Sequence, residues 1–135
     1  MLSKVPVRIM CGSPSRTTRL RSTVPLTDLS SLFAVLPQNA WAHFHCEAGL
    51  GRTTTFMVLY DMLRNADRVS LDDIVQRQKI LSKGYDVLQP PDADDWKAPY
   101  AANRTKFVRA FYDYARANPD GRPKLWSEWL KSGAQ

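Results

Sequence analysis

The spacing of apolar side chains predicts a mostly helical protein. Apolar residues that recur every three or four positions, in runs bounded by a capping residue, a proline or a glycine, predict five helices. These are 27–36, 53–65, 71–81, a long helix between Pro99 and Pro119, and 124–132. The run 53–65 is apolar on nearly all sides, so we expect this helix to lie at the centre of the core.

Two short segments carry the pattern of strands. Residues 41–46 alternate large side chains after a polar turn and lead directly into a loop. Residues 5–10 alternate more weakly before Gly12 interrupts the pattern. The expected fold class is therefore α/β, mostly helical around one or two strands.

A chain of 135 residues has room for one domain. Its first 25 residues are dominated by Ser, Thr, Arg and Pro, so we expect a loosely organised basic segment, 1–25, ahead of a domain over 26–135. Lys4 and Arg8 interrupt the first apolar stretch, which therefore differs from a signal peptide, and no run is long enough to cross a membrane. The chain as written is expected to stay in the cytoplasm.

The net charge of +6 points to an anionic partner. Residues 1–45 hold five basic residues against one acid, Asp28, and so carry +4 of that charge. Such a balance suits nucleic acid, anionic lipid or a polyphosphorylated small molecule. The sequence has no basic helix with interleaved aromatic residues and no zinc-ligand spacing, which argues against nucleic acid.

The strongest chemical signal is a Cys-x5-Arg loop between a predicted strand and a predicted helix. Cys46 and Arg52 frame it, and Gly49 and Gly51 lie between them. Backbone amides of a tight loop that enters a helix N-terminus can converge on a phosphate. We expect these amides from Glu47, Ala48, Gly49, Leu50, Gly51 and Arg52.

Three side chains of this loop are expected to act in catalysis. Cys46 is the candidate nucleophile, because a helix N-terminus and a nearby guanidinium favour the thiolate. Arg52 would bind two phosphate oxygens through its planar fork, and Thr53 would donate a hydrogen bond to the sulfur. Neither a metal nor a cofactor is expected.

Two alternatives give this loop a purely structural role. Cys46 could be a buried core thiol with Arg52 a surface cation, or Cys46 could form a disulfide with Cys11. The glycines at both crowded positions of the loop favour the catalytic interpretation, since only glycine allows so close a backbone approach.

From Trp41 onward the chain resembles the protein-tyrosine-phosphatase superfamily, and within it the bacterial cysteine phytases, which are inositol polyphosphate phosphatases. The strongest part is His43–Val58, in which Glu47 and Ala48 replace the Ser-Ala usual in protein-specific phosphatases. Further matches are Tyr60–Leu63, Arg77-Gln78, Asp95–Lys97 and Trp126–Lys131. The resemblance implies the C-terminal portion of a phosphatase-like fold and an anionic phosphorylated small molecule as substrate; such relatives are often exported.

The resemblance also assigns substrate-binding residues. Basic residues on the helix after the Trp reach the outer phosphates of the inositol ring in that branch, and the matching positions are Lys97 and Arg104, although a solvated helix face explains them equally well. Gln78 is a candidate to position the hydrolytic water, although a glutamine on the surface of its helix is an equally good interpretation. Position 101, often Tyr in relatives, is Ala101.

The general acid of the family has no clear counterpart. Relatives use an Asp some thirty residues before the nucleophile, and the stretch Arg16–Arg21 holds no carboxylate, so Asp28 is the only candidate. This absence and the shortage of strands predict a member that is truncated at its N-terminus, with its first third foreign to the fold. A non-catalytic phosphate-binding module and a protein tyrosine phosphatase are the alternatives to an inositol polyphosphate phosphatase.

Overall fold

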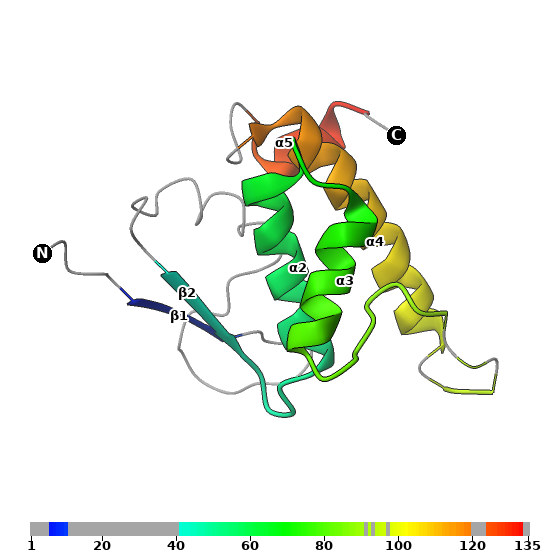
Figure 1. The fold of residues 1–135 in the computed structure, drawn as a ribbon. Helices are drawn as coiled ribbons and strands as arrows, with labels where there is room; N and C mark the ends of the chain where they lie inside the picture. The colour runs from blue at the N-terminus through cyan, green and yellow to red at the C-terminus, as the bar shows by residue number, and fades with distance from the viewer. Residues whose placement is uncertain are drawn as a thin grey trace, which may run out of the picture.

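The computed structural model describes residues 6–10, 41–90, 92, 94–96, 98–119 and 124–133. Within these ranges the chain forms two strands and four helices (Figure 1). Their order is β1 (Pro6–Met10), β2 (Trp41–His45), α2 (Gly51–Asn65), α3 (Leu71–Leu81), α4 (Ala98–Ala117) and α5 (Trp126–Lys131). The mostly helical α/β prediction is confirmed.

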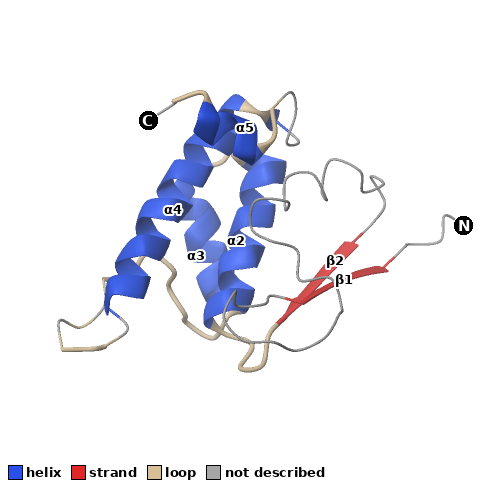
Figure 2. Ribbon diagram, turned by 180° about the vertical axis from the view of Figure 1, so that it is seen from behind, coloured by secondary structure: helices blue, strands red, loops and turns tan. Residues whose placement is uncertain are grey.

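The two strands form a parallel pair. Pro6 is opposite Trp41 and Met10 is opposite His45, so the strands are in register over their whole length. The helices gather on one side of this pair (Figure 2). Both predicted strands are confirmed. Because β1 falls within the segment 1–25, the division of the chain at residue 25 stays a prediction, and the expected helix 27–36 lies outside the described residues.

Helix α2 is the centre of the core, as its apolar sequence predicted. It packs against β2, α3 and α4. Val58, Leu59 and Met62 of α2 are buried, as are Ile74 of α3 and Val108 of α4. Since burying one such side chain contributes roughly 1.5–3 kcal/mol, most of the described fold is stabilised through contacts with α2.

Aromatic side chains fix the short helix α5 against the long helix α4. Trp126 is buried between Phe111 and Tyr114, with ring centroids 5.2 and 5.3 Å away. The hydroxyl of Tyr114 donates to the carbonyl oxygen of Lys124 at 2.7 Å. These contacts hold the C-terminal turn close to α4. The apolar pattern of this segment predicts that Trp126 and Leu130 both face inward; this is confirmed for Trp126 and wrong for Leu130, which is 54% exposed.

The start of α3 is capped as the sequence predicts. Ser70 is the N-cap residue; its Oγ accepts from the backbone N–H of Asp73 at 3.2 Å and donates to the Asp73 carboxylate at 2.7 Å. Such a cap satisfies an N–H that the helix itself leaves unpaired.

A buried carboxylate joins α2 to α3. Asp61 accepts hydrogen bonds from the Arg77 guanidinium, from Gln78 Nε2 at 2.8 Å and from Asn65 Nδ2 at 2.7 Å. Gln78 is itself buried and borders a second, smaller cavity with Phe44. Its amide nitrogen therefore binds Asp61 and joins α3 to α2. Gln78 is not among the residues that line the cavity containing Cys46, so its predicted role in positioning water stays a prediction.

Candidate functional site

The loop that carries Cys46 connects the end of β2 to the start of α2. We call residues 46–52 the Cys46 loop. It follows the carboxyl end of a parallel strand and enters a helix at Gly51. Both features favour anion binding, because backbone N–H groups and the positive end of the helix dipole meet there. The strand, loop and helix order expected from the sequence is confirmed.

The sulfur of Cys46 is a free thiol held by hydrogen bonds. Thr53 Oγ1 donates to Cys46 Sγ at 3.0 Å. Burial raises the pKa of the Cys46 thiol, but this effect is outweighed by hydrogen bonds from the side chain and backbone of Thr53 and from the backbone of Gly49, and by the charge of Arg52, so the net pKa is lowered. The environment therefore favours a thiolate, the form of cysteine that acts as a nucleophile.

Glycine is required at two positions of the loop for different reasons. Gly49 has a φ of +69°, a conformation that L side chains rarely adopt. At Gly51 the backbone is covered by Tyr85, and a Cβ there would lie 3.1 Å from the Tyr85 hydroxyl oxygen. A larger residue at position 49 would strain the backbone, whereas one at position 51 would displace a neighbour.

Two buried threonines fix the carbonyl groups at the end of the loop. Thr54 Oγ1 donates to the carbonyl oxygen of Leu50 at 2.8 Å, and Thr55 Oγ1 donates to that of Gly51 at 2.7 Å. Both threonines are buried. Because these carbonyl oxygens are bonded inside the fold, the loop can direct its N–H groups outward to a ligand.

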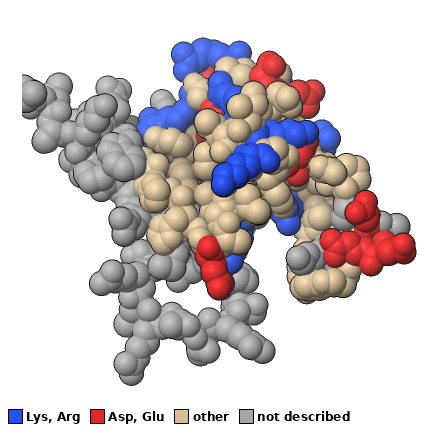
Figure 3. Space-filling model, turned by 60° about the horizontal axis from the view of Figure 1, so that its bottom comes forward, with Lys and Arg blue, Asp and Glu red and all other residues tan. Residues whose placement is uncertain are grey.

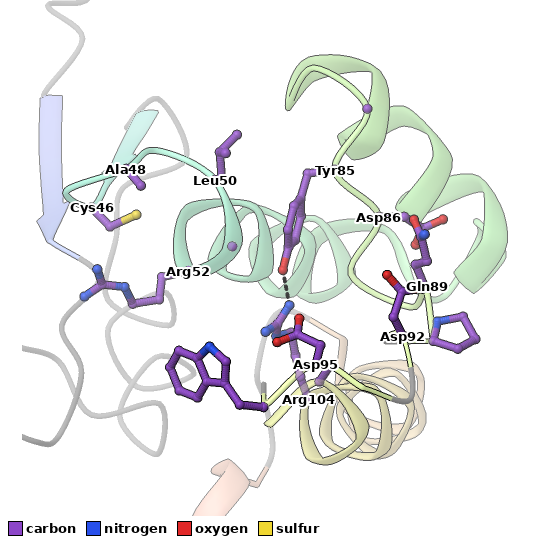
Figure 4. Close-up of a pocket in the computed structure, with 15 residues that line it drawn as sticks. Cys46, Ala48, Leu50, Arg52, Tyr85, Asp86, Gln89, Asp92, Asp95 and Arg104 are labelled. Atoms are coloured by element: carbon purple, nitrogen blue, oxygen red, sulfur yellow. Dashed lines mark hydrogen bonds between the residues drawn. The ribbon is translucent and has the colours of Figure 1, made fainter. Parts of the chain in front are cut away.

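The Cys46 loop forms one wall of a cavity of about 920 Å³ (Figure 4). The lining residues from the loop are Cys46, Ala48, Leu50, Gly51 and Arg52. Of the six residues expected to supply amides, the remaining two, Glu47 and Gly49, are exposed without lining this cavity. Arg52 and Cys46 thus reach the same space, as the sequence predicted.

The opposite wall comes from the segment between α3 and α4 and from α4 itself. Its lining residues are Gly84, Tyr85, Asp86, Gln89, Pro90, Asp92, Asp95, Trp96, Ala101 and Arg104. Arg104 therefore lies in the cavity that contains Cys46. Its guanidinium donates to the Tyr85 hydroxyl and lies 5.8 Å from the centroid of the Tyr85 ring.

Three site residues predicted from the sequence lie outside the described residues. These are Lys97, Asp28 and the alternative disulfide partner Cys11. The roles of Lys97 and Asp28 stay predictions, whereas the alternative disulfide is not formed, because Cys46 is a free thiol.

Sequence reasoning missed Tyr85 and the carboxylates of Asp86, Asp92 and Asp95. Tyr85 follows a glycine stop signal, and Asp92 and Asp95 lie in a stretch that the sequence predicts only as a loop. None of these three residues carries a local signal of cavity lining. Figure 3 shows one group of acidic side chains at the edge of a face, while other acidic side chains lie among the Lys and Arg side chains. Because Arg52 and Arg104 line the same cavity as Asp86, Asp92 and Asp95, its wall is mixed in charge.

The described part of the chain contains no helix long and apolar enough to cross a membrane. In the same residues, no three His, Cys, Asp or Glu side chains gather in a way that could hold a metal ion.

Comparisons with known proteins link the chain to one family. A family model for PTP-like phytases, whose description names inositol hexakisphosphate, matches residues 22–64. The AvrBs1.1 protein of Xanthomonas campestris pv. campestris is 45% identical over 93 residues, which are 68% of this chain and 89% of that protein.

Two solved structures share the fold. A PTP-like phytase from Bdellovibrio bacteriovorus is 52% identical with a TM-score of 0.75, over 78% of this chain and 41% of that one. The PTP-like myo-inositol phosphatase of Mitsuokella multacida, solved in complex with myo-inositol-(1,3,4,5)-tetrakisphosphate, is 41% identical with a TM-score of 0.71, over 79% of this chain and 18% of that one. The chain thus spans less than half the length of either solved protein.

The matched residues include β2, the Cys46 loop and most of α2. The two solved structures superpose on most of the chain. A relative at 45% identity is covered over nearly its whole length. The chain belongs to the PTP-like phytase family.

Proposed function

We propose that the protein is a cysteine-dependent phosphatase that hydrolyses phosphate monoesters, with inositol polyphosphates as its substrate class. The observation that carries this proposal is the Thr53 to Cys46 hydrogen bond of 3.0 Å, at a thiol of lowered pKa that shares a cavity with Arg52. Membership of the family and the tetrakisphosphate bound by the Mitsuokella relative support the substrate class.

In the proposed reaction the Cys46 thiolate attacks phosphorus and the bond to the ester oxygen breaks. The phosphoryl group is then carried on sulfur as a phosphocysteine, and water hydrolyses it to return the thiolate. The loop amides and Arg52 stabilise the charge on the transferring oxygens. Thr53 stabilises the sulfur both as the nucleophile and as the leaving group.

The leaving oxygen needs a proton, and Asp28 is our proposed donor, since it is the only acid before Cys46. General acid catalysis contributes typically 10²- to 10⁴-fold. If Asp28 does not reach the cavity, water must supply the proton. Esters with a good leaving group, such as aryl phosphates, would then be hydrolysed faster than inositol phosphates.

Arg104 is the proposed ligand for an outer phosphate, because its guanidinium lines the same cavity as the thiol. Lys97 is proposed for the same task on the basis of the family resemblance. A guanidinium suits this task because its planar fork can bind two oxygens of one phosphate.

The test is phosphate release from inositol hexakisphosphate and from an aryl phosphate. Cys46→Ser should reduce both rates to background, and Arg52→Lys should remove most activity. Vanadate should inhibit the native protein. Equal rates for the native protein and Cys46→Ser would refute catalysis, and a higher rate with a phosphotyrosine peptide than with the inositol substrate would refute the substrate class.

A second candidate function is phosphate binding without turnover. It is favoured by the sequence before Cys46, in which Asp28 is the sole carboxylate. Calorimetric binding of inositol hexakisphosphate by a protein that releases no phosphate would select this function over the first.

A further inference from the structure

Tyr85 occupies a position between the Cys46 loop and helix α4. Its hydroxyl oxygen would lie 3.1 Å, and its Cζ 3.5 Å, from a Cβ built on Gly51. On its other side it accepts a hydrogen bond from Nη1 of Arg104 (Figure 4). The phenol thus touches the first residue of α2 and a cation of α4, and all three line the cavity that holds Cys46.

The backbone around Tyr85 is fixed by the end of α3. Lys83 and Gly84 have positive φ angles of 57° and 91°, and the Gly84 N–H donates to the carbonyl oxygen of Lys79 at 2.9 Å. The buried Ser82 donates from Oγ to the carbonyl oxygen of Tyr85 at 3.1 Å. This turn anchors the main chain at Tyr85, so its ring is held against Gly51 with little conformational freedom to lose on binding.

The hydrogen bond to Arg104 also determines which further hydrogen bond the Tyr85 hydroxyl can make. A guanidinium has only donors, so the Tyr85 oxygen must be the acceptor, and its own O–H remains to be donated elsewhere. No described residue accepts a hydrogen bond from that O–H. Tyr85 and Arg104 both line the cavity, so the phenol O–H and the guanidinium border one space, in which the Asp95 carboxylate lies beside Arg104 (Figure 4).

We propose that Tyr85 is a positioning and specificity residue for Arg104, the outer-phosphate ligand proposed above: the phenol holds the guanidinium in place and donates its own O–H to the phosphate that Arg104 binds. The inference rests on the proposed function and deepens it, because it assigns a residue that selects polyphosphorylated over singly phosphorylated esters. The guanidinium over the ring face and the hydrogen bond to the phenol oxygen together fix the fork of Arg104.

The experiment compares ligands that carry one and several phosphates. Affinities for inositol hexakisphosphate and for an aryl monophosphate are measured by calorimetry on the Cys46→Ser background, so that turnover is not needed. Tyr85→Phe should weaken binding of the hexakisphosphate about tenfold, as expected for the loss of one hydrogen bond to a charged group. Binding of the monophosphate should change less than about twofold, since its one phosphate occupies the Cys46 loop.

Tyr112→Phe is a matched control. Tyr112 is also half-buried, has Arg116 at 5.8 Å from its ring centroid and uses its hydroxyl in one hydrogen bond, to the carbonyl oxygen of Val69, outside the cavity. Tyr112→Phe should leave both affinities unchanged. A comparable loss of hexakisphosphate binding in this variant would show that Tyr85→Phe acts through general stability.

A double-mutant cycle with Arg104→Ala tests the coupling of the two residues. If they act as one site, Tyr85→Phe should cost less in the Arg104→Ala background than in the native one. Independent effects, or an equal loss for the monophosphate, would overturn the proposal. Native protein that binds no hexakisphosphate would also overturn it, whereas binding without phosphate release would refute only the catalytic part of the proposed function.

Discussion

The ionisation of Cys46 depends on three neighbouring residues. Burial alone would raise the pKa of its thiol. The hydrogen bonds from Thr53 and Gly49 and the charge of Arg52 act in the opposite direction and prevail, so the pKa is lowered. Each of these residues belongs to the Cys46 loop or to the first turn of α2, so the effects that lower the pKa come from the local sequence, whereas burial comes from the packing of the fold.

Replacement of Thr53 by valine should raise the pKa of Cys46. The Thr53 side chain stabilises the thiolate, and valine keeps the shape but donates no hydrogen bond. Because the pKa is lowered, the Cys46 thiolate forms at lower pH than the thiolate of free cysteine. In Thr53→Val it should form at higher pH than in the native protein. The rise in the rate of alkylation by iodoacetamide with pH should shift upward in the same way. A rate profile that is unchanged in Thr53→Val would show that this hydroxyl does not stabilise the sulfur.

Residues of the Cys46 loop could be assigned from the sequence because their roles depend on near neighbours. The spacing of Cys46, Gly49 and Arg52 in one loop is enough to place a thiol, a positive φ and a guanidinium together. Tyr85 could not be found in this way. Its role depends on Gly51 and Arg104, which are far from it in the sequence and meet it only when α3 and α4 pack on α2.

At the scale of the secondary structure elements, the contact between α2 and α3 depends on one buried carboxylate. Asp61 is buried, and the Arg77 side chain that binds it is 43% exposed. Because Arg77 can turn into water when its partner is lost, the cost of removing Asp61 is smaller than for a fully buried ion pair. Gln78 also donates to Asp61, but it is buried, so its amide N–H cannot turn to water when Asp61 is removed.

Replacement of Asp61 by leucine should destabilise the protein by about 2 to 3 kcal/mol, because it leaves buried donors unpaired. The free energy of unfolding in urea is the measurement. Asp67→Asn is the control, since Asp67 pairs with Arg68 at the surface and such pairs contribute about 0 to 1 kcal/mol. Equal losses in the two variants would contradict the structural role of Asp61.

The helix boundaries followed from local signals, whereas the pairing of the strands did not. Ser70 and Gly84 bound α3 by capping and turn chemistry that the sequence displays. Helix α2 begins two residues earlier than its apolar run, because Gly51 already takes part in its first turn. The parallel register of β1 with β2 joins distant segments and has no local signal. Gln78 was similarly ambiguous, because a buried and an exposed helix glutamine look alike in the sequence.

At the scale of the whole molecule, the cavity contains carboxylates that oppose a polyanionic ligand. Asp92 and Asp95 line it and are exposed, and in Figure 4 Asp95 lies beside Arg104. Any ligand that fills the cavity from the thiol outward must approach these negative charges. They limit how much negative charge the ligand can carry at the end away from Cys46.

Replacement of Asp92 by asparagine should tighten the binding of inositol hexakisphosphate by roughly twofold at low salt, because one repulsive charge is removed. The gain should shrink as salt is added, since the Asp92 side chain is exposed to screening. Calorimetric titration at two ionic strengths measures it. Asp113→Asn, at an exposed position of α4 outside the cavity lining, should change the affinity less.

The helix that begins at the Cys46 loop is also the helix around which the described core is packed. An anion held at its N-terminus therefore stabilises the helix on which the core depends, and opening of α2 becomes less favourable while the anion is bound. Occupancy of the cavity and resistance to unfolding are coupled, so a thermal shift or slower amide hydrogen exchange in α2 reports ligand binding even where no phosphate is released.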